Sequence, residues 1–379
     1  MPVSGKSSIA GKTTFALVVS LSIARNALGQ WSATVLEQSP LSRSQINCVL
    51  PGSQGGFGLI GSAQHAVLWS GSPSSWFDLT PGATGFSAVT AMVPGQQVGY
   101  IGPHAALWTG TPQSLVDLNV AGNVISGIGA TNGFEQVGSV TQTVSSAPRA
   151  YLWHGTVASA TSLHPIGAVG SSAVALADGH EGGWITVSGG SLYHAALWSG
   201  SASSFVDMNL GFAESQIRGM AAGQQVGWAR EAGSSQHAAM WHGSPASWMD
   251  MNPPGAGTSV LNASSGSAQV GAANLGGFYG DAGIWFGTPD SFVNLGSFLP
   301  SGMFFQSVAT SVTELNGVFY VGGYASLAST GDNQAILWVG VPAPGASAIA
   351  LLGLLMGARR RRDHVIHSDS RGSSHLARG

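Results

Sequence analysis

The stretch "GQQVGWAREAGSSQHAAMWHG", from Gly223 to Gly243, decides the fold because the chain repeats its pattern. A second copy, "GQQVGYIGPHAALWTG", runs from Gly95 to Gly110. The five-residue phrase that ends both copies at Trp occurs seven times, with its tryptophan at Trp69, Trp108, Trp153, Trp198, Trp241, Trp285 and Trp338. Successive tryptophans are 39 to 53 residues apart. Such a period in a chain rich in small and β-branched residues predicts a β-propeller with one four-stranded blade per repeat.

Each repeat offers four strand-sized pieces separated by Gly-rich or Ser-rich breaks. In the fifth repeat these pieces are "SQIRGMA" from Ser215, "QQVGWAR" from Gln224, "HAAMWHG" from His237 and "SWMDMN" from Ser247. Breaks of this kind are typical of β-hairpin connections. The sequence therefore predicts an all-β fold, a single seven-bladed β-propeller over residues 30–340.

The last repeat contains only three of the four strands, starting at Phe304, Gly317 and Gln334. The segment "WSATVLEQ" from Trp31 precedes the first repeat and has no partner in it. We expect this segment to pair into the last blade as its fourth strand. That pairing would close the ring and remove two exposed sheet edges.

The repeated phrases resemble the HAF repeat of bacterial extracellular proteins. "GQQVG", "HAALW" and "DLN" follow one another in the order of that repeat, and the resemblance spans residues 45 to 340. It implies an extracellular repeat protein. The motif itself is structural and implies no chemistry.

Residues that recur in every repeat are expected to have structural roles. The tryptophans are predicted to pack between adjacent blades, where each would bury a large apolar area. A glycine stands two residues after every one of them and indicates a turn position with positive φ. These glycines are Gly71, Gly110, Gly155, Gly200, Gly243, Gly287 and Gly340.

Five repeats carry His or Arg four residues before the tryptophan, at His65, His104, Arg149, His194 and His237. Five carry Asp or Asn nine residues after it, at Asp78, Asp117, Asp207, Asp250 and Asn294. A metal or catalytic role is one interpretation of these pairs. Because equivalent residues of different blades are spread around the ring, we expect instead that each pair forms hydrogen bonds within its own blade.

The charge distribution excludes nucleic acid as a partner. Between Gln30 and Pro342 there is no lysine, and four arginines stand against fourteen acidic residues. A nucleic-acid-binding surface needs clustered basic residues. The single cysteine, Cys48, excludes an intrachain disulfide and a cysteine-based metal site. We expect Cys48 to be a buried apolar residue, and a reactive thiol is the alternative.

Both ends of the chain have the pattern of export signals. Lys6 and Lys12 precede the apolar run "TTFALVVSLSIA", and small residues follow at Ala27 and Gly29, so residues 1–29 are predicted to be a secretory signal peptide that is cleaved before Gln30.

Residues 341–362 resemble the PEP-CTERM sorting signal, which exosortase-type membrane proteases process. Pro342 and Pro344 precede an apolar stretch, and Arg359, Arg360, Arg361 and Arg362 follow it. The resemblance implies an exosortase-like protease as a partner and transient attachment to the membrane through this segment alone. A plain C-terminal membrane anchor is the alternative. Residues 363–379 are expected to be a disordered polar tail.

Catalytic and metal-binding motifs are absent from the sequence. It contains no G-x-S-x-G, no H-E-x-x-H and no complete calcium loop, so neither a metal nor a cofactor is expected. The residues that break the repeat pattern are the candidate ligand-binding residues. They are Asp178, His180, Glu181 and Trp184 in the fourth repeat and Trp228, Arg230 and Glu231 in the fifth. Aromatic rings beside carboxylates suit sugar binding, whereas ordinary surface loops are the alternative.

These observations favour an exported, non-enzymatic protein of the cell surface or extracellular matrix, with exopolysaccharide or other surface proteins as partners. One alternative is a polysaccharide hydrolase or lyase in which Asp178, His180 and Glu181 form the acid–base group. Another is an adhesin that binds a protein.

Overall fold

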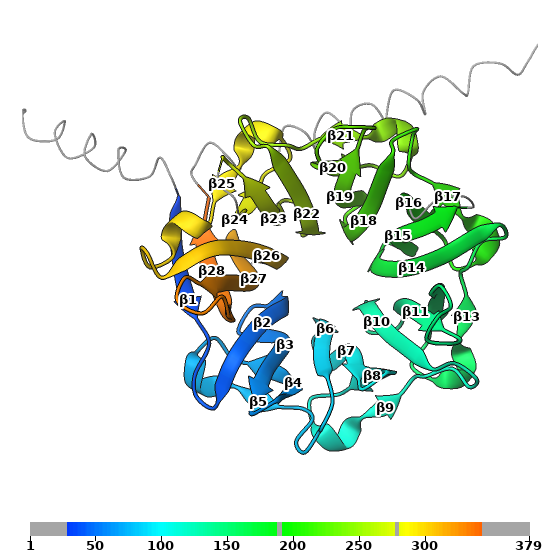
Figure 1. The fold of residues 1–379 in the computed structure, drawn as a ribbon, viewed down its shortest axis with the longest axis horizontal. Coiled ribbons are helices and arrows are strands. Elements are labelled where there is room, and N and C mark those ends of the chain that lie inside the picture. Colours follow the sequence, from blue (N-terminus) through cyan, green and yellow to red (C-terminus); the bar gives the residue numbers. More distant parts are fainter. Residues whose placement is uncertain (1–28, 188–191, 277–279, 343–379) are drawn as a thin grey trace, which may run out of the picture. The chain divides into compact units, whose positions relative to one another are not determined.

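Seven four-stranded antiparallel sheets surround a common centre in the computed structural model, which describes residues 29–187, 192–276 and 280–342 (Figure 1). The ring belongs to one compact unit, residues 31–340. The predicted seven-bladed β-propeller is confirmed. In the described residues the helices are single 3₁₀ turns, and none is long or apolar enough to cross a membrane.

The blades follow the repeats in chain order. Blades 1 and 2 comprise β2 (Leu41–Leu50), β3 (Ser53–Ile60), β4 (Ala63–Trp69), β5 (Phe77–Asp78), β6 (Ser87–Val93), β7 (Gln96–Ile101), β8 (His104–Trp108) and β9 (Val116–Asp117). Blades 3 and 4 comprise β10 (Ile125–Thr131), β11 (Gln136–Thr141), β12 (Arg149–Trp153), β13 (Thr161–Ser162), β14 (Ala168–Ala177), β15 (His180–Val187), β16 (Tyr193–Trp198) and β17 (Val206–Asp207). Blades 5 and 6 comprise β18 (Glu214–Ala221), β19 (Gln224–Arg230), β20 (His237–Trp241), β21 (Met249–Asp250), β22 (Thr258–Ser264), β23 (Gln269–Asn274), β24 (Asp281–Trp285) and β25 (Val293–Asn294). Blade 7 comprises β26 (Phe304–Leu315), β27 (Val318–Leu327), β28 (Asn333–Val341) and β1 (Gln30–Val35).

The first strand of each blade lies nearest the centre, and the later strands follow outward (Figure 1). The turns between first and second strands lie at one end of the strands, which we call the turn face. In blades 3, 4 and 5 these turns are residues 132–135, 178–179 and 222–223. The turns between second and third strands lie at the other end, which we call the opposite face.

The N-terminal strand closes the ring, as predicted. β1 is the outer neighbour of β28 in the last sheet. The Ser32 hydroxyl donates to the Val339 carbonyl at 3.3 Å, and the Leu36 amide donates to the Ala335 carbonyl at 2.8 Å. Leu36 is fully buried in a cluster with Trp69 of blade 1. The N-terminal segment therefore joins the last blade to the first.

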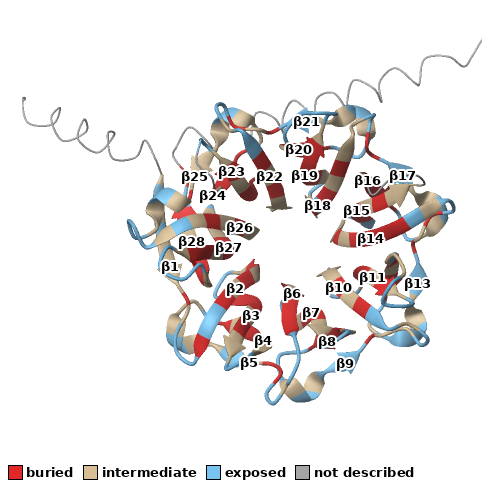
Figure 2. Ribbon diagram, viewed as in Figure 1, coloured by how far each residue is buried: buried red, intermediate tan, exposed pale blue. Residues whose placement is uncertain are grey.

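The repeated tryptophans pack between blades, as predicted. All seven side chains are fully buried and are among the largest in the core. Figure 2 colours the buried residues of the strands red. Trp241 of blade 5 shows the arrangement, because it shares a cluster with Leu197 and Met208 of blade 4 and with Ile217 of its own blade. Each tryptophan thus covers the face of the preceding blade.

A ring of serines, which the sequence reading did not identify, also links the blades. A buried serine in the first strand of each blade accepts a hydrogen bond, at 2.8–3.0 Å, from a backbone amide of the preceding blade. The donor is in each case the alanine that directly follows the His position of the repeat. These serines are Ser44, Ser87, Ser126, Ser171, Ser215, Ser259 and Ser307. Ser44 receives its bond from Ala335 and so repeats the same contact across the closure.

The fourth strands of blades 1 to 6 are shorter than predicted. "SWMDMN" was expected to be a strand from Ser247, but the strand is only Met249–Asp250, and a 3₁₀ turn occupies Pro245–Ser247. The Asp250 carboxylate accepts the Asn252 amide at 2.8 Å, which ends the ladder by giving that amide a local partner.

The glycine after the tryptophan has positive φ in six blades and not in the seventh. The values lie between 74° at Gly155 and 90° at Gly110. The prediction is wrong for Gly340, which lies within β28 and pairs with Phe319. The seventh repeat needs no turn there because its fourth strand comes from the N-terminus.

Several predicted segments fall outside the described residues. They are residues 1–28 of the predicted signal peptide, and Pro344, Arg359, Arg360, Arg361 and Arg362 of the predicted sorting segment, together with the tail at 363–379. Pro342 is the last described residue of the chain.

Candidate functional site

The repeated His and Asp residues pair within their own blades, as predicted. The imidazole Nδ1 lies 2.7–2.9 Å from the aspartate in the pairs His65–Asp78, His104–Asp117, His194–Asp207 and His237–Asp250. In blade 6 the Asn294 amide donates to the Asp281 carboxylate at 2.9 Å. Within residues 29–187, 192–276 and 280–342, no three His, Cys, Asp or Glu residues are grouped as metal ligands would be. The pairs therefore hold the third and fourth strands together.

Asp178 lies in the turn between β14 and β15, and His180 is the first residue of β15. Asp178 has a φ of 53° and Gly179 a φ of 71°, which is a tight hairpin turn. The Asp178 carboxylate accepts the Gly223 amide of the next blade at 2.8 Å. His180 Nδ1 lies 2.9 Å from the Asp178 carbonyl. This carboxylate therefore links two neighbouring turns on the turn face.

Glu181 occupies a position that is glutamine in five other blades. Gln54, Gln97, Gln136, Gln225 and Gln269 each accept the amide of the glycine that follows the repeated tryptophan, at 2.7–2.9 Å. Glu181 accepts the Gly200 amide in the same way at 2.9 Å, and its side chain is buried. Burial raises the pKa of Glu181, the Gly200 amide lowers it, and the charge of Glu135 raises it further. Glu181 is thus a structural residue of its blade with a titratable group in place of an amide.

The two candidate tryptophans pack against their own blades. Trp184 contacts Tyr193 edge to face, with ring centroids 4.9 Å apart. Trp228 is 6% exposed, and its indole N–H donates to the Gln216 side chain at 3.2 Å. Trp228 is therefore covered by its own blade, whereas Trp184 is half-buried.

Arg230 and Glu231 lie at the other end of the strands from Asp178. Arg230 ends β19 and forms an ion pair with Glu214 at the open end of that hairpin. The Glu231 carbonyl accepts the Ser234 hydroxyl at 3.0 Å in the following turn, on the opposite face. A strand of seven residues is about 20 Å long, so the structure does not bring Arg230 and Glu231 together with the Asp178 turn.

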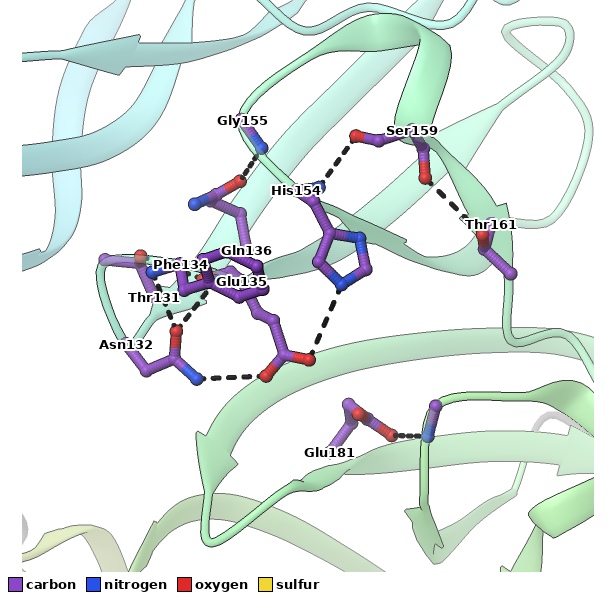
Figure 3. Close-up of polar contacts among 11 residues, drawn as sticks. Thr131, Asn132, Phe134, Glu135, Gln136, His154, Gly155, Ser159, Thr161 and Glu181 are labelled. Carbon is purple, nitrogen blue, oxygen red and sulfur yellow. Dashed lines mark hydrogen bonds and ion pairs between the residues drawn. The ribbon is translucent and has the colours of Figure 1, made fainter.

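An exposed cluster on the turn face of blade 3 is the better candidate site. Its residues are Asn132, Phe134, Glu135 and His154, and we call it the rim cluster (Figure 3). Phe134 is 74% exposed, and its ring lies edge to face on His154 with centroids 5.5 Å apart. Sequence reasoning passed over it because blade 3 has a longer turn here than blades 4 and 5.

The Glu135 carboxylate is held between two polar side chains. The Asn132 amide donates to Oε2 at 2.9 Å, and His154 Nε2 lies 3.6 Å from Oε1 (Figure 3). The Asn132 oxygen in turn accepts the amides of Phe134 and Glu135, at 3.0 and 2.7 Å, which fixes the turn. A preorganised carboxylate, an amide and an imidazole therefore surround one exposed aromatic ring.

An apolar groove of about 460 Å³ lies between blades 1 and 2. It is lined by residues 79–83, Ile101, Pro112, Gln113 and Leu115. Blades 4 and 6 place Phe205 and Phe292 at the position of Leu115, where they contact the repeated tryptophan with centroids 5.9 and 4.8 Å apart. Blade 2 has the smaller Leu115 at this position, and it lines the groove.

No family model and no curated protein matches the sequence. Among solved structures, the chain is similar to a mutant puromycin hydrolase in complex with PGG, with a TM-score of 0.53 and 10% identity over 80% of this chain and 56% of that one. Puromycin hydrolase itself gives a TM-score of 0.52 at the same identity and coverage. A sialidase from Trypanosoma rangeli gives 0.40 at 12% identity over 90% of this chain and 62% of that one. The chain spans about half the length of the puromycin hydrolase structures, and the likeness shows the propeller fold alone.

The unusual Glu181 leads to a pH-dependent prediction. Its pKa is raised by folding, so the folded protein disfavours the ionised form, and stability is lost as pH rises through the ordinary range of a glutamate. Glu181→Gln restores the residue of the other blades. It is expected to raise the free energy of unfolding at pH 7.5 by about 0.5–2 kcal/mol, the usual range of a stabilising substitution. Urea denaturation at pH 7.5 and near pH 4 measures the effect.

The gain from Glu181→Gln should shrink near pH 4, because protonation of Glu181 removes much of the buried charge. Glu231→Gln is the matched control, because it removes the same charge from an exposed residue and should leave stability nearly unchanged. A gain that is equal at both pH values would contradict the assignment.

Proposed function

We propose that the chain is an exported protein of the cell surface or extracellular matrix, and that its propeller is a non-enzymatic binding module for exopolysaccharide. The observation that carries the proposal is the rim cluster, in which the exposed Phe134 ring stands beside the fixed carboxylate of Glu135. The export signals that the two ends of the sequence resemble, and an exosortase-like protease as a partner, belong to the same proposal.

The chemistry of the rim cluster suits a sugar. A pyranose ring presents C–H groups on its faces, which pack on an aromatic ring, and hydroxyls at its edge. The Glu135 carboxylate accepts hydrogen bonds from hydroxyls, and His154 and Asn132 offer further polar atoms. Asn132 and His154 hold Glu135 before any ligand arrives, so little side-chain entropy is lost on binding.

The net charge of the propeller indicates which charge class of polysaccharide can bind. Acidic residues outnumber arginines by fourteen to four between Gln30 and Pro342, and the rim cluster itself carries Glu135. A polyanion would be repelled by this surface. We therefore infer a neutral polysaccharide at the rim cluster.

The contacts of the acid–base candidates support binding over hydrolysis. The Asp178 carboxylate is engaged by the Gly223 amide, and Glu181 is buried against the Gly200 amide. A general acid must lie within hydrogen-bond distance of the oxygen of the bond that is cleaved. Glu181 is not presented to a polymer in this way, and the exposed Asp178 has one carboxylate oxygen bound to a neighbouring turn.

The test is retention of the purified protein on the exopolysaccharide of its own host, with polymer length measured in parallel. Phe134→Ala is expected to weaken binding about tenfold, which corresponds to about 1.4 kcal/mol, because it removes the exposed ring. Glu135→Gln should weaken it less, since the amide still offers one acceptor. Phe86→Ala is the matched control, because Phe86 is 67% exposed in a different connection, between β5 and β6.

Three results would oppose the proposal. Equal losses in Phe134→Ala and Phe86→Ala would show unspecific adhesion. Polymer shortening that disappears in an Asp178→Ala, Glu181→Ala double variant would establish the hydrolase or lyase. Retention of a surface protein with none of the polysaccharide would establish the adhesin.

A further inference from the structure

The innermost strand of every blade carries one residue that interrupts its pairing with the second strand. The register of each first strand shifts by one residue at this point, as in a β-bulge. The seven unpaired residues are Asn47, Thr90, Gly129, Val174, Arg218, Asn262 and Thr310. We call them the inner ring, because their strands surround the centre in Figure 1.

Four members of the inner ring donate to a carbonyl of the next blade. Asn47 and Thr90 donate to the carbonyls that precede the next interruption, at 2.7 and 2.6 Å. Asn262 and Thr310 do the same at 2.9 and 2.7 Å. These uncharged side chains therefore have a structural explanation, because they tie the first strands of neighbouring blades together.

Arg218 departs from this pattern. It donates to the side-chain oxygen of Asn262 at 3.1 Å, rather than to a backbone carbonyl. A guanidinium has five N–H donors, and this bond uses one of them. Asn262 is itself fixed by its bond to the Ala309 carbonyl, so it is a positioning residue for Arg218.

The charge of Arg218 has no carboxylate partner in the part of the chain that the structure describes. The other charged residues of the first strands do have partners, since Arg43 pairs with Asp332 and Glu214 with Arg230, and Glu314 accepts the Ser267 hydroxyl. Arg218 remains accessible to solvent, although its surroundings are crowded enough that burial lowers its pKa. Its charge acts on Tyr324 of blade 7, whose pKa burial raises and Arg218 lowers.

We propose that Arg218, positioned by Asn262, forms an anion site at the centre of the ring that binds the carboxylate group of a ligand. A guanidinium matches a carboxylate in geometry, because two parallel N–H groups meet two oxygens. One unneutralised positive charge in an acidic protein balances one negative charge, and a doubly charged phosphate would leave an excess. The site is separate from the rim cluster and does not depend on it.

The test compares D-glucuronate with D-glucose by isothermal titration calorimetry at low ionic strength. The two sugars are alike except for the carboxylate. The purified protein is expected to bind glucuronate at least about tenfold more tightly than glucose, with an affinity that falls as salt is added. Arg218→Gln should weaken glucuronate binding about tenfold or more, and Arg218→Lys less, because lysine keeps the charge and loses the paired donors.

Arg149→Gln is the matched control. Arg149 is also exposed, and it stands at the His position of blade 3, where Ser162 replaces the usual aspartate. Its substitution removes the same charge from the protein and leaves the inner ring intact, so glucuronate affinity should stay within about twofold. Melting temperatures of all variants show whether each is folded.

Four outcomes would overturn the proposal. One is equal binding of glucose and glucuronate, and another is full glucuronate affinity in Arg218→Gln. The third is no detectable binding of glucuronate by the unaltered protein. An equal loss in Arg149→Gln and Arg218→Gln would assign the effect to net charge and would also reject the site.

Discussion

Deletion of residues 31–38 is expected to lower the melting temperature by about 10 °C or more. The deletion removes most of β1. It also removes the hydrogen bond from the Leu36 amide to the Ala335 carbonyl and the fully buried Leu36 side chain. It also removes Glu37, which accepts the Ser44 hydroxyl at 3.0 Å and the Gln334 amide at 3.1 Å. Several hydrogen bonds at about 1 kcal/mol each and a buried leucine at about 2 kcal/mol add to a loss of roughly 5 kcal/mol in the free energy of unfolding. In a domain of this size each kcal/mol corresponds to a few degrees of melting temperature.

Differential scanning calorimetry measures this loss, and a synthetic peptide provides the control. A peptide of residues 30–38 added to the shortened protein should restore part of the melting temperature, because the open edge of β28 can pair with it. A scrambled peptide should not. If the deletion leaves the melting temperature unchanged, closure by the N-terminal strand contributes nothing to stability.

Replacement of a repeated tryptophan by alanine is expected to cost about 3–5 kcal/mol, the usual range for a buried aromatic residue. Trp241→Ala would open a cavity between blades 4 and 5, because the side chain is fully buried among residues of both. Chemical denaturation gives the free energy of unfolding. Trp76→Ala, at a half-buried outer position, should cost clearly less.

The substitution Trp→Phe is expected to have different effects on stability at two of these tryptophans. The Trp338 indole donates to the Leu295 carbonyl at 3.0 Å, whereas the Trp241 indole N–H has no partner among the described residues. Trp338→Phe should therefore cost about 1 kcal/mol more than Trp241→Phe, since it removes one buried hydrogen bond and leaves the Leu295 carbonyl with the Phe298 amide alone. Equal costs would show that the Leu295 contact contributes no net stability.

Much of the fold could be predicted because each repeat carries the same burial pattern. Local features of the sequence include a tryptophan in the third strand of each blade and a glycine two residues after it. In most repeats a His stands four residues before the tryptophan and an Asp nine residues after it. The serine ring also has a local signal, because most of the accepting serines follow the alanine whose amide donates to them by 20 or 21 residues, as Ser126 follows Ala105. The fourth strands are shorter than predicted because the Asn252 amide donates to the Asp250 side chain and not to the neighbouring third strand.

The candidate site was harder to predict because a break in a pattern does not reveal its cause. Glu181 breaks the glutamine pattern, yet its carboxylate makes the bond that glutamine makes in other blades. Asp178 and Arg230 are both unusual, but they lie at opposite ends of the strands. Exposure of Phe134 depends on the length of one turn, which periodicity does not report.

The sequence by itself determined the number of blades, the buried tryptophans and the closure by the N-terminal strand, because burial in a repeated unit must repeat with the period of the chain. Only the tertiary structure decided which side chains meet. Phe134 and His154 meet across two strands of one blade, and Arg218 meets Asn262 across two blades, 44 residues away in the chain. Such contacts follow from the stacking of blades around a centre, where residues with no local relation are brought within hydrogen-bond distance.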